Sequence, residues 1–325
     1  MMKKPKVFIT RRIPDTGLNM IYEECDVDLL DQDLPPSKAE LLTHIAGVDG
    51  ILSLLSDPID AEVMQAAGEN LRVISNYAVG FDNIDVQTAT KRGIAVGNTP
   101  DVLTEATADF SFPLMMGAGR RVVEAEKYVR AGKWKTWGPS TLLGVDFAGA
   151  TLGIIGFGRI GKAMARRATG FGMRILFYGP TAQPLPGMTK VDLDTLYRES
   201  DFISLHTPLT PETRYMINAE AFSKMKATAV LVNTARGEVI DQDALYDALK
   251  NHKIFAAGID VTYPEPLPMN SPLLTLDNLI ICPHIASGSR TTRENMANIA
   301  AQNLLAGLKS ERLPHSVNPE IYNKN

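Results

Sequence analysis

Three side chains in the second half of the chain carry groups that bind anions or move protons. Arg236 has a small residue on either side, which leaves its guanidinium reachable, and a guanidinium grips a carboxylate through two parallel hydrogen bonds. His284 follows a proline, and a histidine can deliver a proton near neutral pH. Glu265, in a rigid turn between two prolines, could hydrogen-bond to His284, fix its tautomer and favour its protonated form. Taken singly, each residue is more often structural than catalytic, so the interpretation depends on their surroundings.

A glycine pattern supplies those surroundings. The stretch Thr151–Gly161 reads T-L-G-I-I-G-F-G-R-I-G, a mostly apolar run followed by Gly156, Gly158 and Gly161 in G-x-G-x-x-G spacing. Such glycines allow a tight turn, close approach of the backbone to a pyrophosphate and close packing of a helix on a strand. The helix that begins there directs its free N–H groups and its positive dipole end at the phosphates. A second strand at Met173–Tyr178 closes the unit, which predicts a dinucleotide site rather than a turn without ligand.

The charged residues fall at the ends of predicted strands. Four residues follow four strands in turn: Thr207 after Phe202–Leu205, Arg236 after Ala229–Asn233, Asp260 after Phe255–Ile259, and His284 after Leu279–Cys282. We expect all four along the carboxyl edge of one parallel sheet, where Gly156 would hold the pyrophosphate. A carboxylate anchor, a proton donor and a group that tunes the donor, beside a dinucleotide, form a complete set for reducing a 2-keto acid.

Strands and helices alternate along the chain. In the first hundred residues we expect strands at 6–10, 27–30, 49–55 and 71–75, and helices at 15–23, from residue 37 onward and at 59–67. Ser37 with Glu40 forms a capping box at the start of its helix. The alternation predicts parallel sheets, and 325 residues exceed what one core usually supports. The expected fold is therefore α/β, with two Rossmann-like, doubly wound domains.

The segment Asn76–Asp82, N-Y-A-V-G-F-D, follows the strand expected at 71–75. Ligands of open α/β sheets bind beyond the carboxyl ends of the strands, so Gly80 and the residues before it could offer backbone N–H groups to a small anion. An ordinary strand-to-helix turn fits the same spacing equally well. Leu54 and Leu55, at a strand end expected to face the cleft, hint at a small substrate.

Two segments in the middle of the chain allow more than one structural interpretation. Thr99–Arg130 is expected to be largely helical after Pro100, with a kink or an interruption at Pro113. The segment that follows, Gly132–Val145, carries both tryptophans among glycines and a proline. These aromatic side chains could cover a local core, or they could form an arm that packs on a second subunit. We favour the arm, because aromatic-rich surfaces favour interfaces.

Composition excludes several classes of protein. The net charge of −4 provides no basic field for nucleic acid or an anionic membrane. No apolar run approaches the ~18–20 residues that span a bilayer, and the run after Lys3 and Lys4 is too short for a signal peptide. Cys25 and Cys282 make neither a disulfide framework nor a metal site. We expect a cytoplasmic protein with no resident metal.

With these motifs in place, the sequence resembles the D-isomer-specific 2-hydroxyacid dehydrogenase family over essentially its whole length. The resemblance is carried by six segments in order, which are G-F-G-R-I-G (156–161), H-T-P-L-T (206–210), N-T-A-R-G (233–237), A-G-I-D-V (257–261), P-E-P (264–266) and P-H-I-A-S (283–287). Within the family the chain looks most like the glyoxylate/hydroxypyruvate reductases, through G-K-W-K-T-W (132–137), D-V-T-Y-P-E-P-L-P (260–268) and N-L-L-A-G-L (303–308).

The resemblance implies roles for particular residues. It implies Arg236, Glu265 and His284 as the catalytic set, and Asp260 as the residue that holds the nicotinamide carboxamide. It suggests that the substrate is bound by backbone N–H groups near Val79 and Gly80, and the full set expected around the substrate is Leu54, Ala78, Val79, Gly80, Arg236, His284, Ser287 and Trp137. The residues expected around the cofactor are Thr104, Gly156, Phe157, Gly158, Arg159, Ile160, Gly161, Gly179, Thr181, Thr207, Pro208, Thr213, Thr234, Ala235 and Asp260.

The resemblance also implies a domain plan. A discontinuous substrate-binding domain, residues 1–100 with 289–325, would surround an inserted cofactor domain, residues 101–288. Closure of the two domains about hinges near Pro100 and Ser289 would exclude water from the site. Relatives of this kind are dimers through the cofactor domain, so we expect a homodimer in which Trp137 reaches the pocket of the partner subunit.

The choice of cofactor depends on the end of the second strand of the glycine unit. NAD-selective proteins place an acid there, about 20 residues past the glycines, to bind the ribose hydroxyls. Gly179 occupies that place in this chain, and no carboxylate follows until Asp192. The arginine that usually clasps a 2′-phosphate is also missing, although Thr181 could donate a hydrogen bond. We predict a modest preference for NADP(H), with NAD(H) possible.

The sequence therefore predicts hydride transfer from a nicotinamide to the carbonyl carbon of glyoxylate or hydroxypyruvate, with Arg236 as the anchor and His284 as the proton donor. One alternative is reduction of another 2-keto acid, such as 2-ketogluconate or phenylpyruvate. Another is a nucleotide-sensing interaction protein, because the C-terminal binding protein corepressors share the fold and the same Arg/Glu/His set. The absence of a long disordered tail or a partner-recruiting segment argues against this last role.

Overall fold

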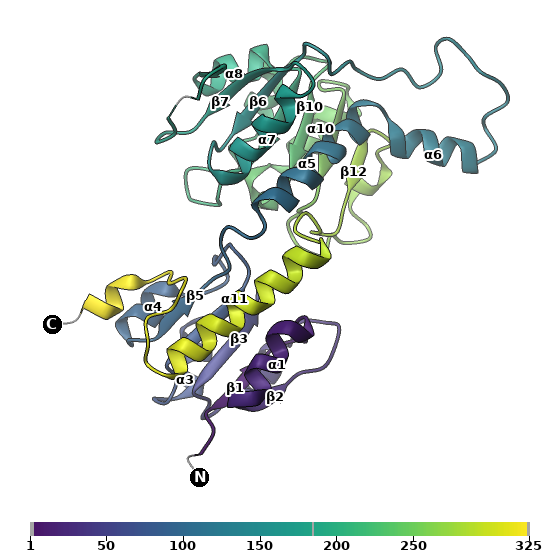
Figure 1. Cartoon of the computed structure of the whole chain (residues 1–325). Helices are drawn as coiled ribbons and strands as arrows, with labels where there is room; N and C mark the ends of the chain where they lie inside the picture. Colours follow the sequence, from purple (N-terminus) through teal and green to yellow (C-terminus); the bar gives the residue numbers. More distant parts are fainter. Residues whose placement is uncertain (1–2, 184, 324–325) are drawn as a thin grey trace. The chain divides into compact units, whose positions relative to one another are not determined.

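The computed structural model describes residues 3–183 and 185–323, and it divides the chain into two compact units (Figure 1). One unit combines the chain up to Leu103 with the chain from Gly288 onward, and the other is Thr104–Ser287. Each unit is built on one parallel sheet, of five strands in the first and seven in the second. The predicted fold class, α/β with one unit inserted into a discontinuous other, is confirmed.

The five-stranded unit has the strand order β2-β1-β3-β4-β5. Its strands are β1 (Lys6–Ile9), β2 (Asp26–Leu29), β3 (Gly50–Leu54), β4 (Val73–Tyr77) and β5 (Ala95–Gly97), and its helices are α1 (Asp15–Glu24), α2 (Lys38–His44), α3 (Ala61–Ala67), α4 (Val86–Lys91) and α11 (Arg290–Leu308). A 3₁₀ turn, η3 (Pro319–Asn323), lies near the end of the chain. The predicted capping box of Ser37 and Glu40 is present at the start of α2.

Helices α1 and α11 cover one face of this sheet, and α2, α3 and α4 cover the other. The long α11 comes from the far end of the sequence, yet it supplies core residues such as Ala297 and Leu304. Gly17 lets α1 approach it closely, because a Cβ at Gly17 would lie 2.3 Å from the carbonyl oxygen of Ala297. Burial of this apolar surface is what ties the C-terminal segment to the first hundred residues.

The seven-stranded unit has the strand order β12-β11-β10-β9-β6-β7-β8. Its strands are β6 (Thr151–Ile155), β7 (Arg174–Tyr178), β8 (Met188–Lys190), β9 (Phe202–Leu205), β10 (Val230–Asn233), β11 (Ala256–Ile259) and β12 (Leu279–Ile281). Its helices are α5 (Thr104–Gly119), α6 (Val122–Arg130), α7 (Arg159–Thr169), α8 (Leu193–Glu199), α9 (Ala219–Lys224) and α10 (Gln242–Lys250), with 3₁₀ turns η1 (Gly237–Val239) and η2 (Pro272–Thr275). Helices α5 and α7 cover one face of the sheet (Figure 1), and α8, α9 and α10 cover the other.

Several predicted boundaries are wrong in instructive ways. The strand expected at 71–75 is β4 (Val73–Tyr77), so the first two residues of the N-Y-A-V-G-F-D segment belong to the strand. The helix expected after Pro100 begins only at Thr104, and it continues through Pro113. The break falls instead at Arg121, whose φ of 56° is left-handed. Burial of the neighbours of Pro113 in the core holds the helix together despite the lost hydrogen bond.

The segment after α6 extends away from the body of the seven-stranded unit (Figure 1), and its side chains stand in solvent. Trp134 is 62% exposed and Trp137 79% exposed, so the alternative in which the tryptophans cover a local core of their own chain is wrong. Helix α6 itself has no buried residue. Within the described residues, no helix is both long enough and apolar enough to cross a membrane.

Candidate active site

The three glycines at the end of β6 each meet a different constraint. Gly156 has a φ of 92°, and a Cβ there would lie 2.4 Å from the carbonyl carbon of His206. A Cβ at Gly161 would lie 2.3 Å from the carbonyl oxygen of Gly156, so this glycine lets α7 pack on the turn. A Cβ at Gly158, in contrast, would meet no atom of the described residues outside its own chain neighbours and helix backbone within 4 Å. That open space is where a ligand can approach the backbone.

The first turn of α7 is suited to an anion. Gly158 is the N-cap residue and has no side chain to cap the helix, and the first turn contains no acidic residue. The backbone N–H groups and the positive end of the helix dipole therefore face the open space at Gly158. These features fit the pyrophosphate of a dinucleotide, as the sequence predicts for Gly156, Phe157, Gly158, Arg159, Ile160 and Gly161. The Phe157 side chain stacks on Phe177 in the core, so only its backbone is available to a cofactor.

The carboxyl edge of the sheet is level across five strands. Ile155, Leu205, Asn233, Ile259 and Ile281 pair in register with one another along β6, β9, β10, β11 and β12. The residues that follow these positions must emerge at the same edge. The sequence prediction that Thr207, Arg236, Asp260 and His284 lie along one edge with Gly156 is confirmed.

His284 and Glu265 form the hydrogen bond that the sequence predicts. Nδ1 of His284 lies 2.9 Å from Oε2 of Glu265, and the second carboxylate oxygen accepts the backbone N–H of Thr262 at 3.0 Å. Burial raises the pKa of Glu265, but the hydrogen bond and charge of His284, the N–H of Thr262 and the charge of Arg236 outweigh it, so the pKa lies below its ordinary value. Glu265 is therefore an anion that accepts from Nδ1, which leaves Nε2 as the other ring nitrogen for a ligand.

Asp260 shapes the backbone that carries His284. It is 1% exposed, and its two carboxylate oxygens accept the N–H groups of Ile285 and Ala286 at 2.8 and 2.7 Å. Its carbonyl oxygen accepts the N–H of His284 at 2.8 Å, and His284 has a left-handed φ of 55°. Burial raises the pKa of Asp260 against the opposing effect of these amides. The structure thus gives Asp260 a positioning role, and its contact with nicotinamide stays a prediction.

Arg236 lies on a turn that its neighbours hold in place. The side chain of Asn233 donates to the carbonyl of Arg236 at 2.8 Å and accepts the N–H of Ala235 at 3.0 Å. The next residue, Gly237, packs directly on the Glu265 loop, because a Cβ there would lie 2.1 Å from the carbonyl carbon of Thr262. The charge of Arg236 also contributes to lowering the pKa of Glu265, after the larger effects of burial, His284 and Thr262.

The remaining predicted cofactor residues are spread along the same unit. Thr234 shares a 2.8 Å hydrogen bond with Ser111, and Thr213 donates to the carbonyl of Pro208 at 2.7 Å, which closes the turn after Thr207. Thr104 is the first residue of α5, Ser287 is the last residue of the unit, and Trp137 lies on the exposed segment. The predicted reach of Trp137 into the pocket of the partner subunit stays a prediction.

Sequence reasoning gave no role to His206, which follows the last residue of β9. Its Nε2 lies 2.8 Å from the hydroxyl oxygen of Ser204, and its Nδ1 is buried without a partner among the described residues. Burial lowers the pKa of His206 to about 4. Its carbonyl and the following peptide press against Gly156, as the close approach above shows. The signal in the sequence is a histidine directly after a strand, inside the H-T-P-L-T motif. The motif alone assigns that histidine no separate role.

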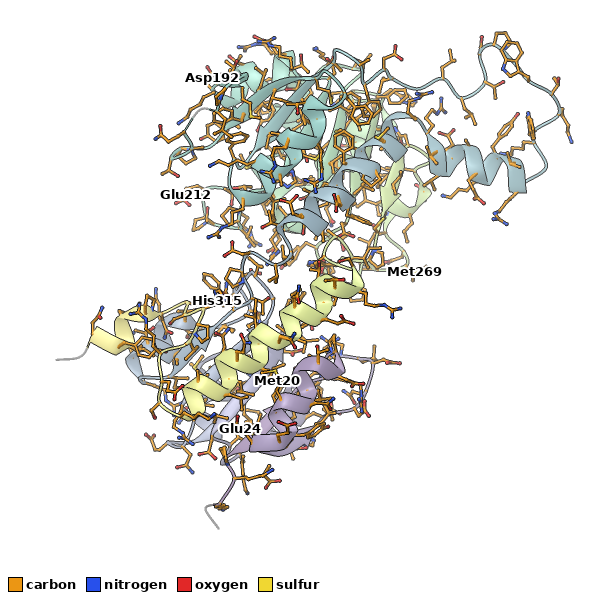
Figure 2. All side chains as sticks on the ribbon, viewed as in Figure 1. Met20, Glu24, Asp192, Glu212, Met269 and His315 are labelled. Atoms are coloured by element: carbon orange, nitrogen blue, oxygen red, sulfur yellow. The ribbon has the colours of Figure 1, made fainter. Side chains whose placement is uncertain are left out.

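Sequence reasoning also missed β8 and the lysine at its end. The Nζ of Lys190 donates to the carbonyls of Pro180 and Ala182, at 3.2 and 3.1 Å, on either side of Thr181. Lys190 pairs with Phe177 in register, so its charge lies at the carboxyl end of β7, beside the predicted ribose position. Asp192, labelled in Figure 2, caps α8 instead, and the N–H of Thr195 lowers the pKa of its carboxyl.

In the five-stranded unit, the predicted substrate residues lie at two neighbouring strand ends. Leu54 is the last residue of β3, and its N–H donates to the buried carboxylate of Asp57 at 2.7 Å. Ala78 follows the end of β4, and Val79 and Gly80 continue the turn. Strands β3 and β4 pair in register up to Leu54 and Tyr77, so these residues share one carboxyl edge.

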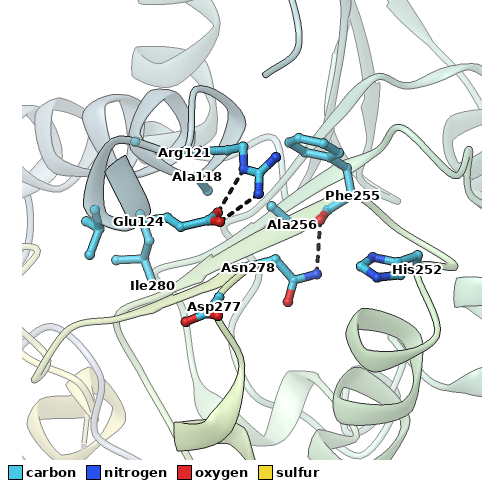
Figure 3. Close-up of a pocket in the computed structure, with 11 residues that line it drawn as sticks. Ala118, Arg121, Glu124, His252, Phe255, Ala256, Asp277, Asn278 and Ile280 are labelled. Atoms are coloured by element: carbon cyan, nitrogen blue, oxygen red, sulfur yellow. Dashed lines mark hydrogen bonds and ion pairs between the residues drawn. The ribbon is translucent and has the colours of Figure 1, made fainter. Parts of the chain in front are cut away.

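A surface hollow elsewhere in the seven-stranded unit is not part of this site (Figure 3). It lies at the amino ends of β11 and β12, where Ala256 and Asn278 line it, on the opposite edge of the sheet from His284. Arg121 and Glu124 pair with each other across it. No cluster of three or more histidine, cysteine, aspartate or glutamate side chains among the described residues could hold a metal ion.

Comparison with known proteins places the chain among oxidoreductases. Residues 112–286 match the model of the D-isomer specific 2-hydroxyacid dehydrogenase NAD-binding domain. The chain is 54% identical to a glyoxylate reductase of Korarchaeum cryptofilum over 323 residues, which is 98% of this chain and 97% of that protein. It is 50% identical to a glyoxylate reductase of Thermofilum pendens, over 98% of this chain and 96% of that protein.

Solved structures agree over the full length. The TT0316 protein of Thermus thermophilus superimposes with a TM-score of 0.92 at 48% identity, covering 96% of this chain and 99% of that one. An NADPH-dependent glyoxylate/hydroxypyruvate reductase of Sinorhizobium meliloti, solved with NADP and malonate, gives a TM-score of 0.84 at 31% identity, with 98% of each chain covered.

Proposed function

The chain belongs to the D-isomer-specific 2-hydroxyacid dehydrogenase family, and we propose that it reduces glyoxylate and hydroxypyruvate to the corresponding 2-hydroxy acids with NAD(P)H. The observation that carries the proposal is the 2.9 Å pair of His284 and Glu265 beside Arg236, on the edge that also carries the glycine turn. The glyoxylate reductases to which the chain is about half identical support glyoxylate, and the glyoxylate/hydroxypyruvate reductase of similar structure supports hydroxypyruvate.

When bound, the nicotinamide nucleotide supplies the hydride. The open backbone at Gly158 and the uncapped start of α7 would hold its pyrophosphate. The predicted contacts of Thr207, Thr234 and Asp260 stand at the ends of the neighbouring strands, where the rest of the cofactor would lie.

Arg236 binds the substrate carboxylate and polarises the carbonyl oxygen. A guanidinium is suited to both tasks, because it donates through a planar fork and keeps its charge at any working pH. In the five-stranded unit, the backbone N–H groups of Val79 and Gly80 are the groups that the sequence predicts for a substrate carboxylate, and unpaired N–H groups suit such an anion. Neutralising the carboxylate in this way makes the neighbouring carbonyl carbon easier to attack.

His284 delivers the proton that completes the reduction. With Nδ1 donating to Glu265, Nε2–H of the imidazolium donates to the carbonyl oxygen and transfers its proton as that oxygen becomes an alkoxide. One hydride reaches carbon and one proton reaches oxygen, which balances the reduction. Solvent then reprotonates the neutral imidazole. Asp260 keeps His284 at its left-handed position through the two amides that follow it.

We propose a modest preference for NADPH over NADH. Gly179 at the end of β7 places no carboxylate against a 2′-phosphate, and the next acid, Asp192, is engaged in capping α8. Thr181 donates to the phosphate, and Lys190 supplies positive charge on the carbonyl side of the same turn. Because Lys190 acts from behind the turn rather than as a direct clasp, the preference stays below a hundredfold.

We also propose a homodimer formed through the seven-stranded unit. Helix α6 buries none of its residues, and Val122, Val129, Trp134, Trp137 and Leu143 are all exposed on it and on the segment that follows. A run of apolar side chains this exposed is typical of a protein interface. Light scattering of the purified protein should give twice the 35.4 kDa chain mass, and Val129→Asp should yield monomer.

The experiment that tests the activity is oxidation of NADPH and NADH, followed by absorbance, against glyoxylate, hydroxypyruvate, pyruvate, phenylpyruvate and 2-ketogluconate. We expect fast turnover of the first two, with NADPH favoured. Fast turnover of 2-ketogluconate or phenylpyruvate alone would contradict the substrate assignment. A hundredfold or greater preference for NADH would contradict the cofactor assignment. No turnover of any keto acid with cofactor still bound would favour the nucleotide-sensing role instead.

A further inference from the structure

The turn after β4 is held by its carbonyl oxygens. The carbonyl of Ala78 accepts the backbone N–H of Thr99 at 2.8 Å. The carbonyl of Val79 accepts the side-chain amide of Asn98 at 2.8 Å, and that of Gly80 accepts the side-chain amide of Asn76 at 2.9 Å. The carbonyl oxygens of three successive peptide groups in the 78–81 turn thus accept hydrogen bonds from other parts of the protein.

This arrangement orients three backbone N–H groups. In a trans peptide the C=O and N–H bonds point in opposite directions, so each N–H points away from the donor that holds its carbonyl. The groups concerned are the N–H groups of Val79, Gly80 and Phe81. Within the described chain, none of the three donates to a protein acceptor. The turn therefore presents three unused donors, which together suit an anion and in particular a carboxylate.

The two asparagines are themselves fixed. The carbonyl of Asn98 accepts the side chain of Asn303, a buried residue of α11, at 2.9 Å. Asn76 is fully buried, where its Oδ1 accepts the hydroxyl of Ser53 and its Nδ2 also donates to Asn83 at 3.0 Å. Because both residues are locked by neighbours, the orientation of the turn is set before any ligand arrives.

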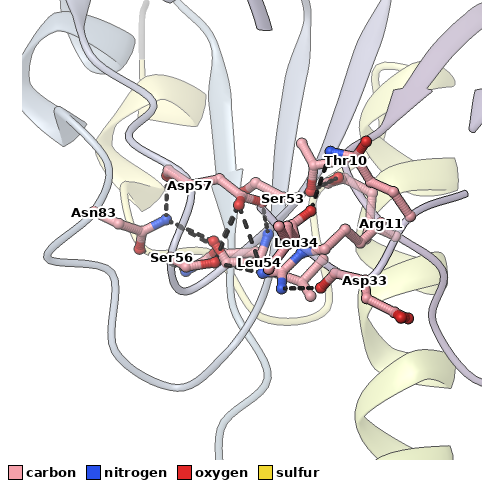
Figure 4. A network of polar contacts seen from close by, with 12 residues as sticks. Thr10, Arg11, Asp33, Leu34, Ser53, Leu54, Ser56, Asp57 and Asn83 are labelled. Carbon is pink, nitrogen blue, oxygen red and sulfur yellow. Dashed lines mark hydrogen bonds and ion pairs between the residues drawn. The ribbon is translucent and has the colours of Figure 1, made fainter. Parts of the chain in front are cut away.

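The same network reaches the end of β3. The side chain of Asn83 donates to the carbonyls of Leu54 and Asp57, at 3.1 and 2.9 Å (Figure 4). Asp57 is fully buried and accepts the N–H of Leu54 and the hydroxyl of Thr10. One connected set of uncharged amides and one buried carboxylate therefore fixes both strand ends that carry predicted substrate residues.

We propose that Asn98 and Asn76 are positioning residues for the substrate carboxylate, and that they act by aiming the N–H groups of Val79, Gly80 and Phe81. The inference rests on the proposed reduction of a 2-keto acid and adds residues that touch no substrate. Neither asparagine brings charge to the site, so the contribution to binding comes from orientation alone. Asn98 is the better target for a test, because it is half-buried while Asn76 is fully buried.

The test replaces Asn98 by leucine, which has a similar shape and no donor. We expect KM for glyoxylate and the inhibition constant of oxamate, a carboxylate that is not reduced, to rise together by about 10-fold or more, because a charge-assisted hydrogen bond is worth about that. The kcat should change less, and the dissociation constant of NADPH should stay the same. Asn98→Asp, of the same shape, should act in the same direction and serves if the leucine variant does not fold.

The matched control is Asn278→Leu. Asn278 is also half-buried and also donates to two carbonyls, those of Leu249 and Phe255, but it lies in the other unit, at the hollow in Figure 3. It should lower the melting temperature without moving KM. Unchanged KM and unchanged oxamate inhibition in a folded Asn98 variant would overturn the proposal.

A second readout does not depend on turnover. In ¹⁵N-labelled wild-type holoenzyme, oxamate should shift the amide resonances of residues 79–81, and Asn98→Leu should reduce these shifts. If no keto acid is reduced but oxamate still shifts these amides and Asn98→Leu reduces the shifts, the proposed function fails and the positioning role stands. If keto acids are reduced but these amides do not respond to oxamate, the positioning role fails and the proposed function stands.

Discussion

The carboxyl edges of the two sheets carry different kinds of functional group. The carboxyl edge of the seven-stranded sheet carries charged side chains, Arg236, Glu265 and His284, whose functional groups would touch the ligand directly. At the corresponding edge of the five-stranded sheet, amide side chains such as Asn76 and Asn98 turn inward and hold carbonyls. There the backbone N–H groups would meet the ligand. We propose that one edge would bind its ligand with side chains and the other with oriented backbone N–H groups.

This difference decides how substitutions act. Changing a side chain that touches the ligand removes a reacting group, whereas changing one behind the backbone alters only the direction of a donor. We therefore expect large effects on kcat at the seven-stranded edge and effects concentrated in KM at the five-stranded edge. The experiments below test that division, from the largest expected effect to the smallest.

The largest effect should come from His284→Gln. A general acid contributes roughly 10²- to 10⁴-fold to rate, so kcat for glyoxylate should fall by about that factor while NADPH still binds. His252→Gln is the control, because His252 lies at the hollow on the opposite edge of the same unit. An unchanged kcat in His284→Gln would mean that His284 is not the proton donor. The proposed difference between the two edges would then be wrong.

The second effect concerns stability, and it should single out the seven-stranded unit. The pKa of His206 lies at about 4 in the folded protein, below its ordinary value near 6.5 in an unfolded chain. The neutral imidazole therefore stabilises the folded protein fully above about pH 6.5. This contribution to the free energy of unfolding is lost as the pH falls towards 4. At 1.36 kcal/mol per pKa unit, the loss in unfolding free energy amounts to roughly 3 kcal/mol.

The measurement is calorimetric unfolding between pH 7 and pH 4. The transition of the seven-stranded unit should move to lower temperature on acidification, and His206→Gln should remove most of that pH-dependent part. His315→Gln, in the five-stranded unit, controls for the loss of a histidine elsewhere. If His206→Gln retains the full acid sensitivity of the wild type, the buried imidazole is not its source.

The third effect tests which edge anchors the substrate carboxylate. Arg236→Lys keeps the charge but loses the planar fork, so kcat/KM for glyoxylate should fall by roughly 10- to 150-fold, which corresponds to about 1.5–3 kcal/mol. Arg174→Lys, whose ion pair with Glu199 lies at the amino end of β7, should have no effect on kcat/KM. If kcat/KM for glyoxylate stays at the wild-type value in Arg236→Lys, the anchor lies elsewhere.

The same contrast explains what the sequence could predict. Charged residues and glycines have a recognisable type and position, so the glycine turn, the level strand ends and the bond between His284 and Glu265 all followed from the sequence. Ser37 and Glu40 did so as well, because a capping box is local in sequence. The capping box joins residues three positions apart, and the parallel sheet dictates the place of each strand end. His284 and Glu265 lie 19 residues apart, but their chemistry and the two prolines around Glu265 make the pair recognisable.

Contacts between residues that belong to no motif could not be predicted in this way. The 78–81 turn fits an ordinary turn equally well, because its carbonyl partners at 98 and 99 carry no motif. The break at Arg121, rather than at Pro113, depends on core packing around α5. Strand β8 is three residues long, so its pattern was too short to separate from the surrounding loop, and Lys190 was missed with it.

The smallest predicted effect comes from Lys190. It tests whether every charged residue at the seven-stranded edge acts through its charge. If Lys190 supplies charge behind the turn of Thr181, Lys190→Met should raise KM for NADPH by a few-fold and leave KM for NADH unchanged, because only NADPH carries the 2′-phosphate. The rise should shrink at high salt, since an exposed charge is screened. Lys250→Met, on α10, is the control. An equal rise in KM for both nucleotides would mean that Lys190 only holds the turn of Thr181 in place. The seven-stranded edge would then act at this point as the five-stranded edge does, through the shape of its backbone.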